Sequence, residues 1–201
     1  SEKVGNWAGV TVDKKESPIR KSFYKGEEGV TVVDLPGAYS MSPFTSEEGV
    51  TSTYVKSEKP DAIINIVDAT NLSRSLFFTT QLMELGIPVV IALNKSDINE
   101  KKGTQIDIGK LSKALGCPVI QTVSTNAGGL QEVVDAVISV SGKGQKAPYE
   151  GAEEKMIDKA SAMEADRKRY SFVNDIVKSV ETRKVFTKDR NKQDKVDVVL
   201  T

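Results

Sequence analysis

Histidine is absent from this chain of 201 residues, and Cys117 is its only cysteine. Without histidine, neither imidazole acid–base catalysis nor histidine metal ligation is available. A single cysteine forms no disulfide within the chain, which is typical of proteins from a reducing compartment. Because Cys117 lies between Gly116 and Pro118, where a strand is expected to start, we interpret it as a small buried hydrophobic residue.

Net charge and long apolar runs are missing as well. Lysine plus arginine and aspartate plus glutamate number 28 each, so no net field favours binding to nucleic acid or to an anionic membrane. No apolar stretch approaches the roughly 18 residues that a membrane-spanning helix needs. At 201 residues, the chain is long enough to bury one good core and a small appendage.

Strand-like and helix-like patterns alternate along most of the chain. Two extended segments, 10–15 and 19–23, are predicted around a turn at Ser17–Pro18. Further strands are predicted at 30–34, 61–68, 89–93 and 117–121, and helices at 46–54, 72–85, 108–115 and 130–140. This alternation predicts an α/β fold in which helices cover both faces of a mostly parallel sheet.

The composition changes after residue 142. Glycine and lysine are frequent over 141–148, which predicts a linker at 143–152. Apolar positions then recur at helical spacing up to about residue 183, so a small all-α domain is predicted over 153–201, after an α/β domain over 1–142. We interpret the charged run Asp166-Arg167-Lys168-Arg169 as a solvated helix face rather than a phosphate site.

The most informative motif is Asn94-Lys95-Ser96-Asp97, directly after an apolar run at 87–93. At the end of a strand, the Asp97 carboxylate can accept two hydrogen bonds from the N1–H and the exocyclic amine of guanine. The Asn94 amide would meet the base from its Hoogsteen side, and the stem of Lys95 would lie along its face. A polar strand end would also explain this motif, so alone it is only suggestive.

Two further loops follow strand-like runs. In Asp34-Leu35-Pro36-Gly37, the aspartate can hold Mg²⁺ through a water, and the glycine can bring its N–H against a terminal phosphate because no Cβ blocks the approach. In Val123-Ser124-Thr125, backbone N–H groups would lie near the guanine oxygen. Three such loops, each after a strand and in this order, predict a guanine-nucleotide site at one edge of the sheet.

The amino-terminal run Gly5-Asn6-Trp7-Ala8-Gly9-Val10-Thr11-Val12 closely resembles the first switch of the G domain of ferrous iron transport protein B. The resemblance continues through 33–40, 65–72 and 94–97, and reaches the carboxyl end at 165–170 and 194–201. It implies a P-loop-GTPase-like domain followed by a small helical domain, which in that family leads into the first transmembrane helix.

The resemblance also implies a role for each loop residue. Thr11 would give its hydroxyl to Mg²⁺ and its N–H to the γ-phosphate, next to Gly9 and Val10. The backbone carbonyls of Gly5 and Trp7 would bind K⁺, which supplies the charge of an arginine finger. Thr11 and Gly37 would be the catalytic residues, because they would lie closest to the γ-phosphate that is hydrolysed. Ala38 replaces the water-orienting glutamine of Ras-like GTPases, so we expect slow, K⁺-activated hydrolysis.

One part of the family pattern is missing, because the sequence has no Gly-x-x-x-x-Gly-Lys-Ser/Thr. In the family this phosphate-binding loop, with a strand before it and a helix after it, precedes the Gly-Asn-Trp run. Since that strand normally lies in the middle of the sheet, its loss predicts two half-sheets with unpaired edges and exposed apolar faces. We expect the natural protein to carry this unit before Ser1, and a chain without it to bind GTP very weakly.

From this resemblance we expect the GTPase domain of a prokaryotic Fe²⁺ uptake transporter, with GTP or GDP, Mg²⁺ and K⁺ as its ligands. Its partners would be the transmembrane region of the same protein, a small accessory iron-transport protein and further copies of itself, at the cytoplasmic face of the inner membrane. The sequence has no cluster of cysteine, histidine and carboxylate residues with the spacing of metal ligands, so we do not expect this chain to bind the transported iron itself. Two alternatives stay open: a ribosome-associated or RNA-associated assembly GTPase, and a nucleotide-responsive interaction module without turnover.

Overall fold

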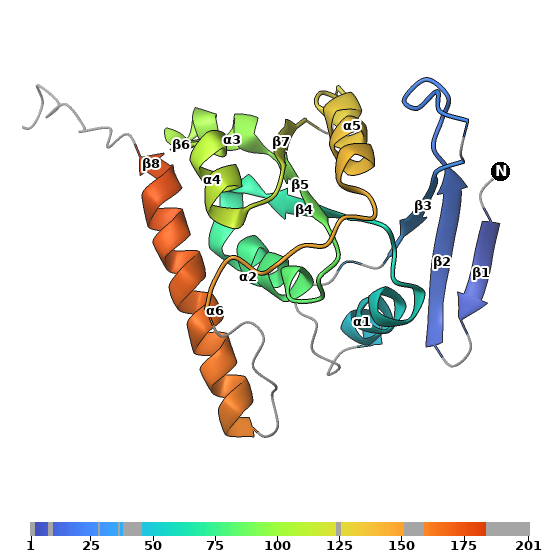
Figure 1. The fold of residues 1–201 in the computed structure, drawn as a ribbon. Coiled ribbons are helices and arrows are strands. Elements are labelled where there is room, and N and C mark those ends of the chain that lie inside the picture. The colour runs from blue at the N-terminus through green and yellow to red at the C-terminus, as the bar shows by residue number, and fades with distance from the viewer. Residues whose placement is uncertain are drawn as a thin grey trace, which may run out of the picture.

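The computed structural model describes residues 3–7, 10–27, 29–35, 37, 46–123, 126–150 and 159–183. Its centre is a parallel sheet of β4 (Ile63–Asp68), β5 (Val89–Asn94) and β7 (Val119–Thr122), in the order β4-β5-β7. The connections are a short 3₁₀ turn, η1 (Ala69–Asn71), with α2 (Leu72–Met83), and then α3 (Ser96–Lys101) with α4 (Ile108–Leu115). Parallel strands need such helical crossovers, and the predicted α/β fold is confirmed (Figure 1).

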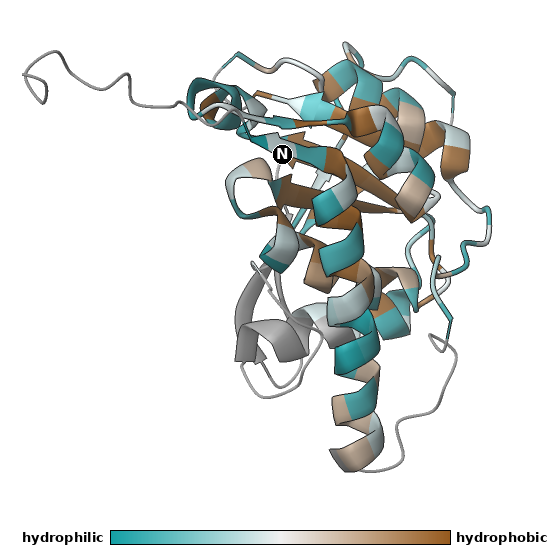
Figure 2. Ribbon diagram, turned by 90° about the vertical axis from the view of Figure 1, so that its left-hand side faces the viewer, coloured by the Kyte–Doolittle hydropathy of each residue, from teal (hydrophilic) through white to brown (hydrophobic). Residues whose placement is uncertain are grey.

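The middle strand β5 shows why helices cover both faces of this sheet. Its side chains alternate, because successive residues of a strand point to opposite faces. Val89, Ile91 and Leu93 join the core that α2, α4 and α6 (Lys159–Val180) cover, whereas Val90 and Ala92 pack under α5 (Leu130–Val140). Figure 2 shows apolar residues in the strands and along the inner helix faces, with hydrophilic residues outside.

A second, antiparallel sheet lies beside the first. It consists of β1 (Lys3–Trp7), β2 (Val10–Pro18) and β3 (Thr31–Asp34), in the order β1-β2-β3, and α1 (Ser46–Glu58) follows it. The turn predicted at Ser17–Pro18 is wrong: both residues belong to β2, where they pair with Val32 and Thr31. The chain turns at residues 21–23 instead.

The two sheets are not joined through their neighbouring strands. Within the described residues, β3 pairs only with β2 and β4 pairs only with β5. On the face of β4 that lies away from α2, the side chain of Ile66 is 72% exposed and that of Ile64 is 38% exposed. Isoleucine is among the residues most often buried, so this arrangement has the unpaired edges and exposed apolar face expected above.

The segment predicted as a helical domain packs, over its described part, on the α/β core. Val173, Ile176 and Val180 of α6 are buried with α2 and α4 in one cluster. The helix was expected to reach about Arg183, but it ends at Val180, because β8 (Glu181–Arg183) pairs antiparallel with β6 (Thr104–Ile106). Residues 151–158 and 184–201 lie outside the described residues, so the division into domains at 142 and 153 stays a prediction.

One of our interpretations of the carboxyl-terminal third needs correction. Arg169 is only 4% exposed and ion-paired with Glu84, so the run from Asp166 to Arg169 is not uniformly a solvated face. The predicted linker is anchored by Gln145, whose N–H donates to the Gly86 carbonyl and whose Oε1 accepts from the Val89 N–H. Among the helices described, none is long and apolar enough to cross a membrane.

Candidate functional site

Three strand ends form a row at the carboxyl edge of the parallel sheet. The register places Asp68 opposite Asn94, and Asn94 opposite Thr122, at the last positions of β4, β5 and β7. In open α/β sheets, ligands bind beyond this edge, where the loops after neighbouring strands meet. Two of the three predicted nucleotide-binding loops, 94–97 and 123–125, follow directly from this row.

Lys95 makes the sharp turn between β5 and α3. Its backbone is left-handed, with φ of 62° and ψ of 23°, which costs a residue other than glycine about 1–2 kcal/mol. The Asn94 side chain supports this turn, because its Oδ1 accepts a hydrogen bond of 2.9 Å from the Lys95 N–H. The turn is tight enough that α3 starts at the next residue, Ser96.

Asp97 lies in the first turn of α3, and its side chain is partly buried. Within the described part of the chain, its carboxylate has neither a hydrogen bond nor an ion pair. A carboxylate in the first turn of a helix interacts favourably with the helix dipole. A partly buried carboxylate that no described neighbour engages is suited to accept two N–H donors from a ligand.

A contact that sequence reasoning missed joins the motif to the neighbouring strand. The Nζ of Lys95 lies 2.6 Å from Oδ2 of Asp68, while Oδ1 of Asp68 accepts from the N–H and the hydroxyl of Thr70. Burial raises the pKa of Asp68, but the hydrogen bonds from Lys95 and Thr70 outweigh it and hold the pKa below its ordinary value. The sequence did contain a signal for this contact: Asp68 ends a predicted strand, Asn94 directly follows another, and the two strands were expected to be parallel.

The loop after β7 is held by its own backbone. Val123 forms an isolated antiparallel bridge with Gly128, and the Oδ1 of Asn126 accepts from the Gly128 N–H at 2.9 Å. Gly129, at the start of α5, has a φ of +80°, and a Cβ there would lie 2.1 Å from the Gln121 carbonyl oxygen. Of the residues predicted to face guanine, Val123 directly follows Thr122, the last residue of β7, while Ser124 and Thr125 lie outside the described residues.

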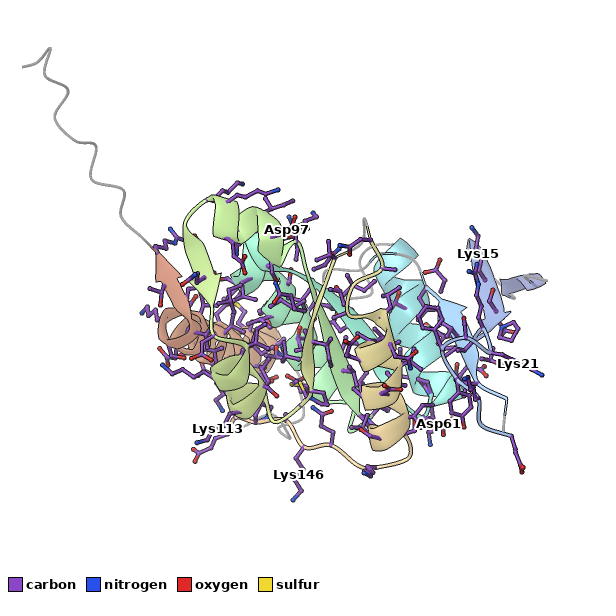
Figure 3. The ribbon with its side chains drawn as sticks, turned by 90° about the horizontal axis from the view of Figure 1, so that it is seen from above. Lys15, Lys21, Asp61, Asp97, Lys113 and Lys146 are labelled. Atoms are coloured by element: carbon purple, nitrogen blue, oxygen red, sulfur yellow. The ribbon has the colours of Figure 1, made fainter. Side chains whose placement is uncertain are left out.

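The residues predicted to face the phosphates belong to the other sheet. Asp34 ends β3 with an exposed side chain, opposite Lys15 of β2. Figure 3 shows Lys15 and Asp97 well apart, so the described residues do not bring the Asp34 turn against the base motif. Leu35 is half-buried, and a Cβ added to the exposed Gly37 would meet no described atom within 4 Å. Packing in the described part therefore does not require this glycine.

The predicted switch segment forms a hairpin instead of a loop. Gly5 and Trp7 lie in β1, paired with Lys14 and Val10 of β2, and Thr11 is the second residue of β2. The loop placement of Gly5 and Trp7 thus differs from the structure, since a bulge between Asn6 and Trp7 lets the two strands pair almost to the turn. Gly9 and Pro36 lie outside the described residues, and the ligand roles of all these residues stay predictions.

The side-chain oxygens of the predicted phosphate-facing residues are of the kind that binds Mg²⁺, one of the expected ions. The exposed carboxylate of Asp34 and the hydroxyl of Thr11 are hard oxygen ligands of the kind that Mg²⁺ takes together with water and phosphate. Within the described residues, no group of three or more His, Cys, Asp or Glu side chains could hold a metal ion by itself.

Comparison with known proteins gives the family. A family model described as ferrous iron transport protein B matches residues 1–137. The chain is 46% identical over 140 residues to the Fe(2+) transporter FeoB of Salmonella typhimurium, covering 68% of this chain and 18% of the relative. It is likewise 46% identical over 140 residues to an Fe(2+) transport protein A/FeoB fusion protein of Porphyromonas gingivalis, covering 69% of this chain and 16% of that one.

Solved structures agree with this. The cytosolic domain of L. pneumophila FeoB superposes with a TM-score of 0.74 at 28% identity, over 90% of each chain. A GDP-bound mutant of the S. thermophilus FeoB G-domain superposes with a TM-score of 0.74 at 30% identity, also over 90% of each chain. The chain spans less than a fifth of the length of the curated relatives it matches. It belongs to the ferrous iron transport protein B family, in the part that corresponds to the G domain.

Proposed function

We propose that this chain binds guanine nucleotides with the residues at the carboxyl edge of its parallel sheet. The observation that carries the proposal is the Asp97 carboxylate, which no described residue engages, next to the row of Asp68, Asn94 and Thr122. Asp97 would accept from the N1–H and the exocyclic amine of guanine, Asn94 would meet the Hoogsteen edge, and Lys95 would lie along the base. Backbone N–H groups of 123–125 would contact the guanine oxygen.

In the same proposal, the antiparallel sheet β1-β2-β3 and the loop after β3 supply the phosphate and metal contacts. Thr11 and Asp34 would hold Mg²⁺, the latter through water, with Gly9, Val10, Leu35 and Pro36 near the nucleotide. Gly37 would donate its N–H to the terminal phosphate. Gly5 and Trp7 would offer backbone carbonyls to K⁺. Bound cations would neutralise charge on the transferring phosphoryl group, and the rest of the site would orient the nucleotide.

We also propose what the family's missing unit would do. A strand with a phosphate-binding loop would fit between β3 and β4, where each strand lacks a described partner on one side and Ile66 is exposed. Such a strand would pair with both edges and cover the apolar face. It would also bring the Asp34 turn and the base motif into one site.

The relatives' names suggest the larger role. Both curated relatives are named for Fe²⁺ transport, and we propose that the chain is the GTPase part of such a transporter, at the cytoplasmic face of the cell membrane. Nucleotide binding and slow, K⁺-activated hydrolysis would regulate iron transport through a transmembrane region. A small accessory protein and self-association are further proposed contacts. Zero net charge disfavours an RNA-associated GTPase.

Base recognition is tested by titrating a fluorescent GDP analogue and its xanthosine counterpart into the wild-type chain and D97N. Xanthine carries an oxygen where guanine carries the amine, so an asparagine, with one acceptor and one donor, suits it better than a carboxylate. We expect D97N to lose GDP affinity by about tenfold or more and to gain affinity for xanthosine diphosphate. An unchanged preference would refute this base site.

Turnover separates the enzyme from a binding module. Phosphate release would be measured with GTP in KCl and in NaCl, on a chain that also carries a phosphate-binding loop before residue 1. Faster release in KCl supports the K⁺-activated GTPase. Nucleotide binding without release in either salt supports a nucleotide-responsive interaction module.

A further inference from the structure

Lys95 and Asp68 belong to different strands but meet beside the proposed base site. The Nζ of Lys95 and Oδ2 of Asp68 are 2.6 Å apart, and the two side chains are 48% and 33% exposed. Because neither side chain is buried, the pair is not enclosed in the core. It lies where the carboxyl ends of β4 and β5 open to solvent, within reach of a ligand at this edge.

Asp68 is itself held in place from several directions. Its Oδ1 accepts hydrogen bonds of 2.9 Å from the Thr70 N–H and 2.7 Å from the Thr70 hydroxyl, so this oxygen caps the η1 turn. One residue further on, the Ala69 carbonyl accepts a 2.6 Å hydrogen bond from the buried Asn99 of α3. The segment after β4 is therefore tied to the helix that carries Asp97, and only Oδ2 of Asp68 is directed to Lys95.

We propose that Asp68 is a positioning residue of the guanine site, which holds the ammonium of Lys95 so that its stem is already aligned for the face of the base. This inference rests on the proposed function. The left-handed turn, supported by Asn94, fixes the backbone end of Lys95, and Asp68 fixes the other end. A free lysine stem has many rotamers. A stem held at both ends loses that freedom when the protein folds, so binding does not have to order it.

An ordinary surface ion pair would give the same distance but a different response. A pair that only stabilises the fold changes the unfolding free energy slightly, and its loss does not depend on whether Lys95 contacts a ligand. A positioning role requires the effect of Asp68 on nucleotide affinity to pass through Lys95. The two roles are therefore separated by combining substitutions at both positions.

The experiment titrates GDP into the 201-residue chain and follows ¹H–¹⁵N NMR, which detects weak binding. The variants are D68N, K95M, D68N/K95M and D107N. In D68N the amide oxygen can still accept from Thr70, while the charge that holds Lys95 is lost. Asp107 is the matched control: it also caps a helix, accepting from the Lys110 N–H, and has a lysine ammonium 3.9 Å away, but it lies at the start of α4 and not at the end of β4.

We expect D68N to weaken GDP binding about three- to fivefold, K95M to weaken it as well, and D68N to cause no further loss in the K95M background. D107N should leave GDP affinity unchanged. The proposal is overturned if D68N has no effect, if it weakens binding equally with and without Lys95, or if D107N has the same effect.

A second readout does not depend on nucleotide. Relaxation of the Lys95 ε-methylene should show a restrained side chain in the wild type and a mobile one in D68N. If the wild type binds no GDP while this difference is present, the proposed function fails but the placement of Lys95 by Asp68 stands. If Lys95 is equally mobile in both chains, the positioning role is refuted whether or not GDP binds.

Discussion

Arg169 of α6 holds Glu84, the residue after α2, with two parallel hydrogen bonds of 2.7 Å, from Nε to Oε1 and from Nη2 to Oε2. Its Nη1 also donates to Oδ1 of Asp166 at 2.6 Å. The Tyr149 hydroxyl donates to the same Oε1 of Glu84, and burial, together with this carboxylate, raises the pKa of Tyr149, so the phenol stays a donor. One carboxylate thus ties together α2, the segment before α6, and α6.

Breaking this pair should destabilise the protein strongly. The Arg169 and Glu84 side chains are only 5% and 14% exposed, so R169M leaves a carboxylate buried without its partner, which costs about 3–5 kcal/mol. Urea denaturation measures the loss, and R169M/E84Q should regain part of it. The control is R167M, because Arg167 is 75% exposed and, among the described residues, ion-paired with Glu164 alone; it should change stability by less than about 0.5 kcal/mol. Equal losses of stability in R169M and R167M would show that the Arg169–Glu84 ion pair has no special role.

The contribution of Asp68 to stability should depend on pH in one direction. Because the folded-state pKa of Asp68 is lowered, its stabilisation is present above the unfolded value of about 3.9 and is lost as the pH falls through the folded-state pKa. Carboxyl ¹³C NMR should show this lowered pKa in the wild type. In K95M the pKa of Asp68 should rise, and an unchanged titration would show that Lys95 does not hold the carboxylate.

Gly129 should not tolerate a side chain. Its φ of +80° costs a residue with a Cβ about 1–3 kcal/mol, and the added atom would lie 2.1 Å from a backbone oxygen of Gln121. We expect G129A to lower the melting temperature and, because the loop from 123 to 129 must shift, to weaken GDP binding too. G144A is the control, since a Cβ at Gly144 meets no described atom within 4 Å. If both variants have the same melting temperature, the Gln121 carbonyl oxygen does not limit the side chain at position 129.

Cys117 should react with thiol reagents only when the core opens. It is 6% exposed, and burial raises the pKa of its thiol to about 12, so at pH 8 only about one thiol in ten thousand would be ionised. Labelling should be slow in the native protein and should accelerate with urea along the unfolding transition. Rapid stoichiometric labelling without denaturant would mean that the β7 side of the core is open.

Local patterns were sufficient for the elements of the parallel sheet. The apolar run before Asn94 forms β5, and the periodic segments at 108–115 and 130–140 form α4 and α5 with the predicted bounds. Strand β8 was missed because three residues after a helix carry no pattern of their own. They are extended only because β6, about 75 residues earlier in the chain, offers them a partner.

The sequence alone determined which hydrogen-bonding groups lie at the end of β5, and so which chemistry is predicted there. Asparagine, lysine and aspartate in this spacing after a buried strand indicate a base site, because hydrogen-bonding capacity belongs to the residue types themselves. Only the tertiary structure decided that Asp68 meets Lys95 and that Arg169 is buried against Glu84 rather than solvated. These contacts join residues 27 and 85 positions apart, and which distant groups meet depends on strand register and helix packing, which no local pattern encodes.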